Sequence, residues 1–259
     1  MHGLWRNTLL ALFFFAAFAL SVHVVGRGEV FVPRVTVSIP EGYTLLQIEN
    51  LLKEKRVLEA GDSLSLDPRS LSGSHPFLAA APSLEGFLFP DTYEFFIDTA
   101  PLRVVERMLG VFQTKAEPLL GGKKNALEAV TLASLIEREV KPSGRDRELV
   151  AGILLKRLAA GMPLQVDAAL CYAKARGACD RVAPEDKALD SPYNTYARRG
   201  LPPAPIGNPG LDALGAALNP RESPYWYYLS AAGSGRTVFA STLDEHNQNI
   251  VNYLRISHE

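Results

Sequence analysis

The sequence predicts an α+β protein with an N-terminal transmembrane helix, a small strand–helix unit and a larger mixed α+β body. Three observations support this prediction. Helical apolar stripes and short strand-like runs follow one another irregularly, without a regular βαβ repeat. Of the 259 residues, 47% are hydrophobic, so the chain can bury a substantial core. An uncharged apolar run also lies near the N-terminus.

The composition excludes several classes of protein. The formal net charge is −1 and the basic residues form no run, so the sequence offers no electrostatic footprint for a nucleic-acid backbone. It contains no GxSxG motif, no phosphate-binding glycine loop and no histidine pair at metal-binding spacing. We therefore expect no nucleic-acid partner, no metal and no cofactor.

The N-terminal segment predicts a membrane anchor. Residues 8–25 contain no Asp, Glu, Lys or Arg, and this length is close to the minimum for one bilayer-spanning helix. We interpret residues 1–27 as an uncleaved signal anchor. A cleaved signal peptide is the alternative, because residues 17–19 read Ala-Phe-Ala, the small-x-small pattern of a processing site. Either interpretation places the rest of the chain outside the cytoplasm, and the uncleaved anchor holds it at the cytoplasmic membrane.

A strand–helix unit is expected next. Residues 34–39 predict a strand, which a Pro-Glu-Gly turn separates from a helix that begins near Thr44. Thr44 and Gln47 have the spacing of a capping box, and an apolar stripe follows at helical spacing. Residues 61–83 are rich in Ser, Pro, Asp and Gly, which predicts a linker. Residues 83–96 are dense in aromatics and too irregular for a plain strand.

The remainder of the chain is expected to mix helices and strands, with boundaries set by proline, glycine and capping residues. The expected elements are a helix over 101–113, a helix over 125–139, a helix from Ser143 to Gly161, an irregular segment over 180–207, a helix to Leu218 with Asn208 as N-cap and Pro209 as first residue, strands within 223–232 and 236–242, and a last helix over 244–256 capped by Thr242 and Glu245.

The helix over 125–139 ends in two glutamates, Glu137 and Glu139, which lie on nearly opposite faces. Because the helix is apolar almost all round, we expect it to be buried and its carboxyl groups to reach a cleft or the core. Burial and the negative end of the helix dipole raise a carboxyl pKa, as a general acid at neutral pH requires. The alternative is that both glutamates pair with neighbouring arginines as ordinary helix-end charges.

Two further polar sets are candidates for ligand contacts. Gln165 and Asp167 stand in an otherwise apolar stretch, which either loop capping or ligand binding explains. A second set combines hydroxyls, an amide and flat aromatic faces, which can bind a sugar, although packing within a loop is the alternative. This set is Tyr193, Asn194, Thr195 and Tyr196.

The two cysteines, Cys171 and Cys179, lie close together in the sequence. In an oxidising compartment such a pair can close a small disulfide-bonded loop. A zinc site would need more ligands nearby, and the five histidines offer none at motif spacing. A local disulfide is therefore the prediction.

Six sequence blocks form an ordered series over about residues 35–255. They are EGFLFPDTYEF (85–95), ASLIERE (133–139), KRLAAGMPLQVD (156–167), SPYNTY (191–196), GLPPAPIGNPG (200–210) and EHN (245–247). Each block alone is weak, but together they are specific, and the series resembles the MltG (YceG-like) endolytic murein transglycosylase family.

The resemblance implies a lytic transglycosylase that cleaves peptidoglycan glycan strands between MurNAc and GlcNAc without water, leaving 1,6-anhydro-MurNAc ends. The second glutamate of ASLIERE falls on Glu139, which the resemblance makes the catalytic acid/base, with Glu137 as a supporting residue. Substrate-binding roles fall on Gln165, Asp167, Tyr193, Asn194, Thr195, Tyr196, Glu245, His246 and Asn247. No second carboxylate is evident at motif level, so the positive charge at C1 would be met by the substrate's N-acetyl group.

The resemblance also implies an organisation and partners. Residues 34–82 would form a short LysM-like unit with its linker, and residues 83–259 the YceG-like catalytic domain. The expected partners are peptidoglycan glycan strands and the cytoplasmic membrane, with peptidoglycan synthases added if the enzyme terminates nascent strands.

The chain departs from the family pattern in two places. The region between anchor and body is shorter than in longer relatives, and residues 236–239 read RTVF, where family members usually have a histidine just before the strand Phe. Two alternative functions stay open: an anchored peptidoglycan-binding or scaffold protein with a decayed site, and a muramidase that lets water attack. Anhydro ends, reducing ends or no products would separate the three.

Overall fold

The computed structural model describes residues 33–121, 126–140, 144–175, 182–231 and 234–254. From Arg34 onward the chain forms one compact unit that mixes helices with two small sheets, which confirms the predicted α+β class. The predicted anchor lies outside the described residues, and within them no helix is long and apolar enough to cross a bilayer.

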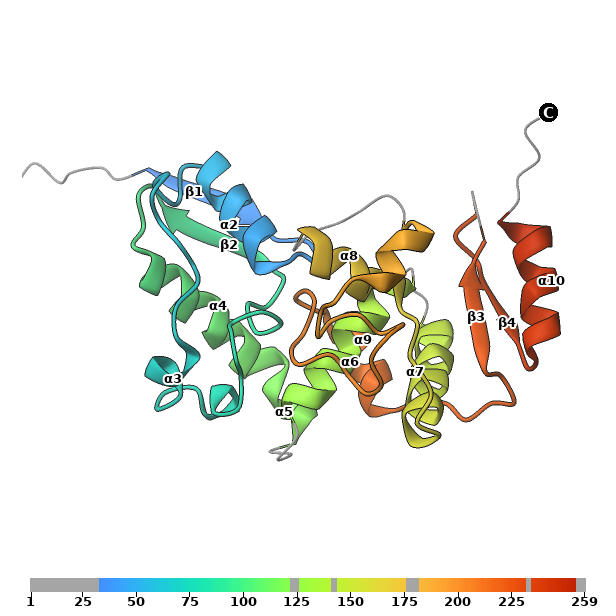
Figure 1. Cartoon of the computed structure of the whole chain (residues 1–259). Coiled ribbons are helices and arrows are strands. Elements are labelled where there is room, and N and C mark those ends of the chain that lie inside the picture. The colour runs from blue at the N-terminus through green and yellow to red at the C-terminus, as the bar shows by residue number, and fades with distance from the viewer. Residues whose placement is uncertain (1–32, 122–125, 141–143, 176–181, 232–233, 255–259) are drawn as a thin grey trace, which may run out of the picture. The chain divides into compact units, whose positions relative to one another are not determined.

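The first sheet pairs two strands that are distant in the sequence (Figure 1). Strand β1 (Arg34–Ser38) is antiparallel to β2 (Thr92–Phe96), with Arg34 opposite Phe96 and Ser38 opposite Thr92. The strand β1 was predicted, but the prediction that residues 83–96 are too irregular for a strand was wrong over β2. In β2 the buried side chains alternate with exposed ones, as in a strand that covers a core on one face.

The helix α2 (Leu45–Glu54) follows β1 and begins at the predicted capping box. The Thr44 hydroxyl accepts a hydrogen bond from the Gln47 backbone N–H, and the Gln47 side chain accepts one from the Thr44 backbone N–H. The predicted linker over 61–83 is mostly irregular and contains only the short helix α3 (Pro68–Leu71) and the 3-10 helix η1 (Pro76–Leu78).

The helix α6 (Ala126–Glu139) lies in the central part of the fold. Its residues from Val130 to Ile136 are all buried, which confirms the predicted buried helix. The other helices of this region are α4 (Pro101–Lys115), α5 (Glu117–Leu120), α7 (Gly144–Ala159) and α9 (Leu211–Leu218). Contacts with both α7 and α9 hold α6 in the core.

The predicted start of α9 was wrong. Gly210 is the N-cap, and Asn208 lies before the helix with its side chain fully buried. The Asn208 amide nitrogen donates to the Tyr43 carbonyl oxygen at 2.8 Å, and its amide oxygen accepts from the Leu88 backbone N–H at 2.8 Å. Asn208 therefore joins three chain segments, and a long-range demand of this kind outweighs a local capping preference.

The C-terminal part contains the helix α8 (Asp167–Ala175), the 3-10 helix η2 (Pro184–Ala188), a hairpin and a last helix. The hairpin strands β3 (Tyr227–Ser230) and β4 (Thr237–Ala240) confirm the two predicted strands. The last helix, α10 (Leu243–Tyr253), has the predicted N-cap Thr242 and packs on the hairpin (Figure 1). The helix α8 was not predicted.

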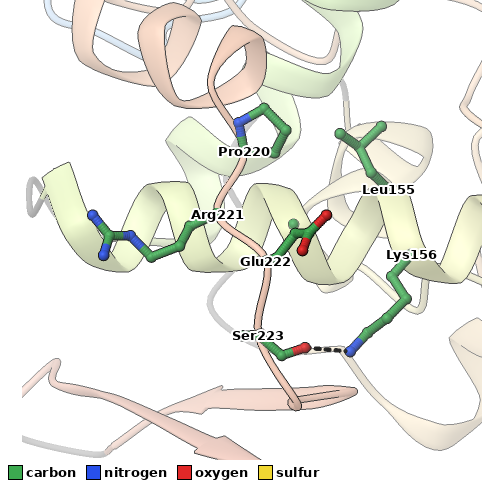
Figure 2. Close-up of a pocket in the computed structure, with 7 residues that line it drawn as sticks. Leu155, Lys156, Pro220, Arg221, Glu222 and Ser223 are labelled. Atoms are coloured by element: carbon green, nitrogen blue, oxygen red, sulfur yellow. Dashed lines mark hydrogen bonds between the residues drawn. The ribbon is translucent and has the colours of Figure 1, made fainter.

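A close approach between α7 and the segment after α9 depends on Gly152. A Cβ at this position would lie 2.1 Å from the Arg221 carbonyl oxygen. Beside this contact is a hollow of about 470 Å³, in which Lys156 Nζ donates to the Ser223 carbonyl oxygen at 2.9 Å (Figure 2). The hollow is lined by α7 and the segment 220–223, and none of the predicted site residues lines it.

We predict that Gly152→Ala destabilises the protein by about 1–3 kcal/mol, because the backbone must move to admit the methyl group. Gly110→Ala in α4 is the control, since a Cβ there meets nothing within 4 Å and alanine favours a helix by up to about 1 kcal/mol. Urea denaturation of both variants measures the difference. Equal stability of the two variants would contradict the close approach.

Candidate functional site

Glu139 lies at the C-terminal end of α6 and contacts two other elements. Its Oε1 accepts a hydrogen bond from the Ala168 backbone N–H, in the first turn of α8, at 3.2 Å. Its Oε2 accepts one from the Tyr228 hydroxyl of β3 at 3.3 Å. The Ser230 hydroxyl donates to the Glu139 carbonyl oxygen at 3.1 Å. Three segments that are far apart in the sequence thus meet at this carboxyl group.

Burial raises the pKa of the Glu139 carboxyl to about 7. The hydrogen bond from Ala168 opposes the rise, the Asp167 charge adds to it, and the Tyr228 hydrogen bond and the Arg138 charge oppose it. Desolvation outweighs two neutral donors and one cation, as expected for a carboxyl with no direct ion pair among its described contacts. The group can therefore both give and take a proton near neutral pH.

A second carboxylate, Asp167, stands next to this group. Asp167 is the first residue of α8 and is exposed, and its Oδ1 accepts a hydrogen bond from the Tyr196 hydroxyl. Burial and this hydrogen bond raise the pKa of the Tyr196 hydroxyl. The structure thus brings together the predicted site residues Glu139, Asp167 and Tyr196.

Gln165 belongs to the same set. It is exposed between the buried residues Leu164 and Val166, and its backbone has a positive φ of 57°. This conformation is uncommon outside glycine and turns the polar side chain out of an apolar stretch. The Gln165 backbone N–H donates to the Thr195 carbonyl oxygen at 3.0 Å, which ties the segment to the loop of Tyr196.

Two predicted substrate-binding residues hold this loop together from inside. Thr195 is 2% exposed, and its hydroxyl exchanges hydrogen bonds with the Val166 backbone. Asn194 is 0% exposed, and its amide nitrogen donates to the carbonyl oxygens of Lys187 and Leu189. Both side chains shape the loop from its buried side.

Tyr193 occupies a different place from Tyr196. Its ring contacts that of Tyr172 on α8, with the ring centroids 5.0 Å apart. Tyr193 is half-buried and faces a groove that is distinct from the surroundings of Glu139.

The three residues of the EHN block, Glu245, His246 and Asn247, have different surroundings. His246 stacks on Tyr227 with ring centroids 5.2 Å apart, and its buried Nδ1 has no hydrogen-bond partner among the described residues. Burial, and then the Arg157 charge, lower the pKa of His246. Glu245 instead caps α10, where its Oε2 accepts from the Ser241 backbone N–H, and Asn247 is exposed.

Arg157 is a site residue that the sequence analysis missed. It is buried, and its guanidinium donates to the carbonyl oxygens of Trp226 at 2.9 Å and Leu164 at 2.8 Å. It also lies over the Tyr227 ring, 5.1 Å from its centroid. The KRLAAGMPLQVD block contains this arginine, but only the folded chain shows that it connects α7, the Gln165 segment and the hairpin.

Glu137, in the same last turn of α6, has different contacts from Glu139. It forms an ion pair with Arg147 of α7, and the two side chains are 6% and 1% exposed. Its Oε2 accepts a hydrogen bond from the Gly210 backbone N–H at 3.1 Å. Burial raises the pKa of Glu137, and the Arg147 charge opposes the rise. The carboxylate fixes the start of α9 from within the protein.

Glu85 is a buried carboxylate that the sequence analysis also missed. Its Oε1 accepts from the Leu45 backbone N–H at 2.9 Å and from the Asn208 amide at 3.2 Å. Its Oε2 accepts from the Tyr172 hydroxyl at 3.2 Å. Glu85 therefore joins the start of α2 to α8 and to the loop that contains Asn208.

Within the described ranges no group of three or more His, Cys, Asp or Glu side chains could hold a metal ion. Cys171 is buried on α8, whereas Cys179 lies outside the described residues, so the Cys171–Cys179 disulfide stays a prediction.

The fold and site define an α+β protein with a carboxyl group of raised pKa at the end of a buried helix. The YceG-like family model matches residues 22–252, and the chain belongs to this family.

Named relatives and one crystal structure are similar to this chain in sequence and in fold. The chain is 36% identical over 206 residues to the endolytic murein transglycosylase of Bacillus subtilis and 31% identical over 246 residues to that of Streptococcus pneumoniae. These alignments cover 78% and 85% of this chain but 54% and 44% of the relatives, so the chain spans about half their length. The crystal structure of a yceG-like protein from Listeria monocytogenes matches with a TM-score of 0.74 and 32% identity, over 85% of this chain and 77% of that one.

We predict that Glu137→Gln lowers the free energy of unfolding by about 3–5 kcal/mol, because Arg147 remains buried without its counter-charge. Glu148→Gln is the matched control. Its partner Arg221 and Glu148 itself are 51% and 35% exposed, so this ion pair contributes less than about 1 kcal/mol. Urea denaturation measures both losses, and a Glu137→Gln loss no larger than the control would refute the structural role of the ion pair.

Proposed function

We propose that this protein is an endolytic peptidoglycan lytic transglycosylase that uses Glu139 as its acid/base. The observation that supports this most directly is the Glu139 carboxyl itself. Its pKa of about 7, its half-buried position and its two neutral hydrogen-bond donors suit repeated proton transfer at neutral pH. The relatives named endolytic murein transglycosylase support the substrate class.

The first step breaks the glycosidic bond. Protonated Glu139 donates its proton to the oxygen that links C1 of MurNAc to C4 of GlcNAc, and the GlcNAc unit leaves as an alcohol. The carbonyl oxygen of the MurNAc N-acetyl group bonds to C1 as this bond breaks, so the positive charge is held within the substrate. The Ala168 N–H and the Tyr228 hydroxyl then stabilise the newly ionised carboxylate.

The second step closes the anhydro ring. The C6 hydroxyl of MurNAc attacks C1, the N-acetyl oxygen leaves, and Glu139 takes the hydroxyl proton. The product is a 1,6-anhydro-MurNAc end, and the carboxyl returns to its protonated form. Water takes no part, so protons and atoms balance between substrate and products.

Asp167 is the carboxylate suited to the N-acetyl group. It is exposed at the start of α8, next to the backbone N–H that contacts Glu139, and Tyr196 orients one of its oxygens. A carboxylate in this place accepts the N-acetyl N–H and increases the electron density on the carbonyl oxygen that bonds to C1. Its charge also keeps the Glu139 pKa high, so one side chain supports both steps.

We predict that Glu139→Gln abolishes anhydro-muropeptide release, since losing a general acid/base typically costs about a hundred- to ten-thousand-fold in rate. Mass spectrometry of peptidoglycan digests, together with the melting temperature of each protein, gives the readout. Glu94→Gln, an exposed carboxylate on β2, is the control that should keep parental rates.

The same digests test the alternatives. Reducing ends from the parent protein would indicate a muramidase, and no products would indicate a binding or scaffold protein. A folded Glu139→Gln variant that still releases anhydro ends at the parental rate would remove Glu139 from the mechanism.

The pH dependence gives a second prediction. The general acid must be protonated in the free enzyme, so the rate should fall as the pH rises through about 7. Because the Asp167 charge raises the Glu139 pKa, Asp167→Asn should move this falling limb to lower pH. Initial rates at limiting substrate measure the shift. Glu94→Gln is the control: it also removes one negative charge, on β2, and should leave the falling limb of the pH profile in place. A falling limb that does not move in Asp167→Asn would contradict the coupling between Asp167 and Glu139.

We also propose the location and organisation that the sequence predicts. Residues 8–25 hold the protein at the outer face of the cytoplasmic membrane, where glycan strands and peptidoglycan synthases meet, and termination of nascent strands is the corresponding role. Residues 34–82 serve as a short LysM-like unit before the catalytic domain. The uncharged apolar run supports the anchor. Alkaline carbonate extraction should leave the protein in the membrane pellet, whereas release with a new N-terminus near residue 20 would show cleavage.

A further inference from the structure

An exposed lysine, Lys187, is separated from the carboxylate of Asp167 by a single side chain. Its ammonium group lies over the ring of Tyr196, with Nζ 4.6 Å from the ring centroid. The hydroxyl of the same tyrosine donates to Asp167, and the backbone N–H of the next residue, Ala168, donates to Glu139. Tyr196 therefore connects a positive charge with the two carboxyl groups of the site.

The backbone at Lys187 is fixed by a buried side chain. Lys187 belongs to η2, and the amide nitrogen of Asn194 donates to the carbonyl oxygens of Lys187 at 3.0 Å and Leu189 at 2.8 Å. Asn194 is fully buried and lies two residues before Tyr196 in the same loop. One loop thus holds both the backbone of the lysine and the ring beneath its ammonium group.

The acidic residues near Lys187 in the sequence have other partners or stay exposed. Asp186 pairs with a lysine of α8 at 2.7 Å, and Asp190 pairs with Arg198 at 2.7 Å. Glu185 is exposed, and Lys187 has no ion pair among the described residues. Attraction of a cation to an aromatic face is weak at an exposed site, so the ammonium group is available to an anion of the substrate.

The two arginines of the site are less accessible than Lys187. Arg157 is buried and donates to two backbone carbonyl oxygens. Arg138 is half-buried, and its charge interacts with Glu85 and Glu139. An anionic substituent on the substrate would be repelled by the carboxylates of the site, and an exposed cation beside them offsets this repulsion.

We propose that Lys187 is a specificity residue that binds a carboxylate on the lactyl substituent of MurNAc, either the lactyl carboxylate itself or one on an attached stem peptide. The proposal rests on the proposed function for the identity of the substrate. In that mechanism Glu139 acts at C1 and Asp167 contacts the N-acetyl group on C2. The lactyl group is attached to C3, so the order of contacts in the protein, from Glu139 through Asp167 to Lys187, follows the order of substituents on the sugar.

The test compares Lys187→Gln with Lys55→Gln in the full chain. Lys55 is also exposed, but it caps the end of α2, where it pairs with Glu54. The substrates are glycan strands with stem peptides, strands stripped to free lactyl carboxylates by an amidase, and stripped strands whose carboxylates are chemically converted to neutral amides. Release of anhydro ends gives kcat and KM for each substrate, and the melting temperature checks folding.

We expect Lys187→Gln to lower kcat/KM about threefold on strands that carry carboxylates, through KM, because an exposed ion pair contributes modestly to binding. On the neutral amide strands it should match the parent. Lys187→Arg should keep the preference for charged strands, and Lys55→Gln should match the parent on every substrate. A loss on stripped strands would assign the lactyl carboxylate, and a loss confined to peptide-bearing strands would assign a stem-peptide carboxylate.

Two outcomes would overturn the role of Lys187. An equal loss on charged and neutral strands would show that the lysine only shapes the loop of Tyr196, and no loss on any strand would show that it does not contact the substrate. A parent protein that releases no anhydro ends from any of the strands would instead refute the proposed function, so the two failures are distinguishable.

Discussion

The structure depends on how a buried apolar helix ends in charged residues. The helix α6 lies in the core, and its last turn contains two glutamates and an arginine that are partly buried. Glu137 is balanced by the buried charge of Arg147, whereas Glu139 receives one backbone N–H and one tyrosine hydroxyl. A full counter-charge favours the carboxylate form, and two neutral donors compensate burial only in part. Two carboxyl groups only two residues apart thus have different partners, an arginine for Glu137 and neutral donors for Glu139.

The loops around Glu139 are held by buried polar groups that reach across long stretches of sequence. Asn208 and Glu85 connect the start of α2, the segment near Leu88 and the turn before α9. Arg157 does the same for the Gln165 segment and the hairpin. Each buried polar group is costly unless bonded, so these contacts favour one arrangement of the loops. A proton-transfer group requires such fixed surroundings, because small displacements change its distance to the substrate.

Local signals in the sequence predicted much of the fold. The capping box of α2, the N-cap of α10 and the proline at the start of α4 act within one helical turn, so they can be read without knowledge of the fold. The strand β2 was missed because its partner β1 lies about sixty residues earlier, and α8 because Ala168 through Tyr172 are all buried and show no amphipathic period. At the site, motif position indicated Glu139 and Asp167, but Tyr228 contacts Glu139, and Arg157 contacts the Gln165 segment and the hairpin, only through tertiary packing.

The pKa of Glu139 explains how a single carboxyl could serve both steps. At the ordinary pKa of 4.5, about one carboxyl group in 300 would be protonated at pH 7, so few molecules could carry out the acid step. At about 7 both forms are equally populated, so neither donation nor removal of the proton is strongly uphill. The proposed reaction returns the proton to the group that gave it, and therefore needs no second acid/base. What it does need is stabilisation of the charge at C1, and the proposed mechanism assigns this to the exposed carboxylate of Asp167, whose neighbour Ala168 contacts Glu139.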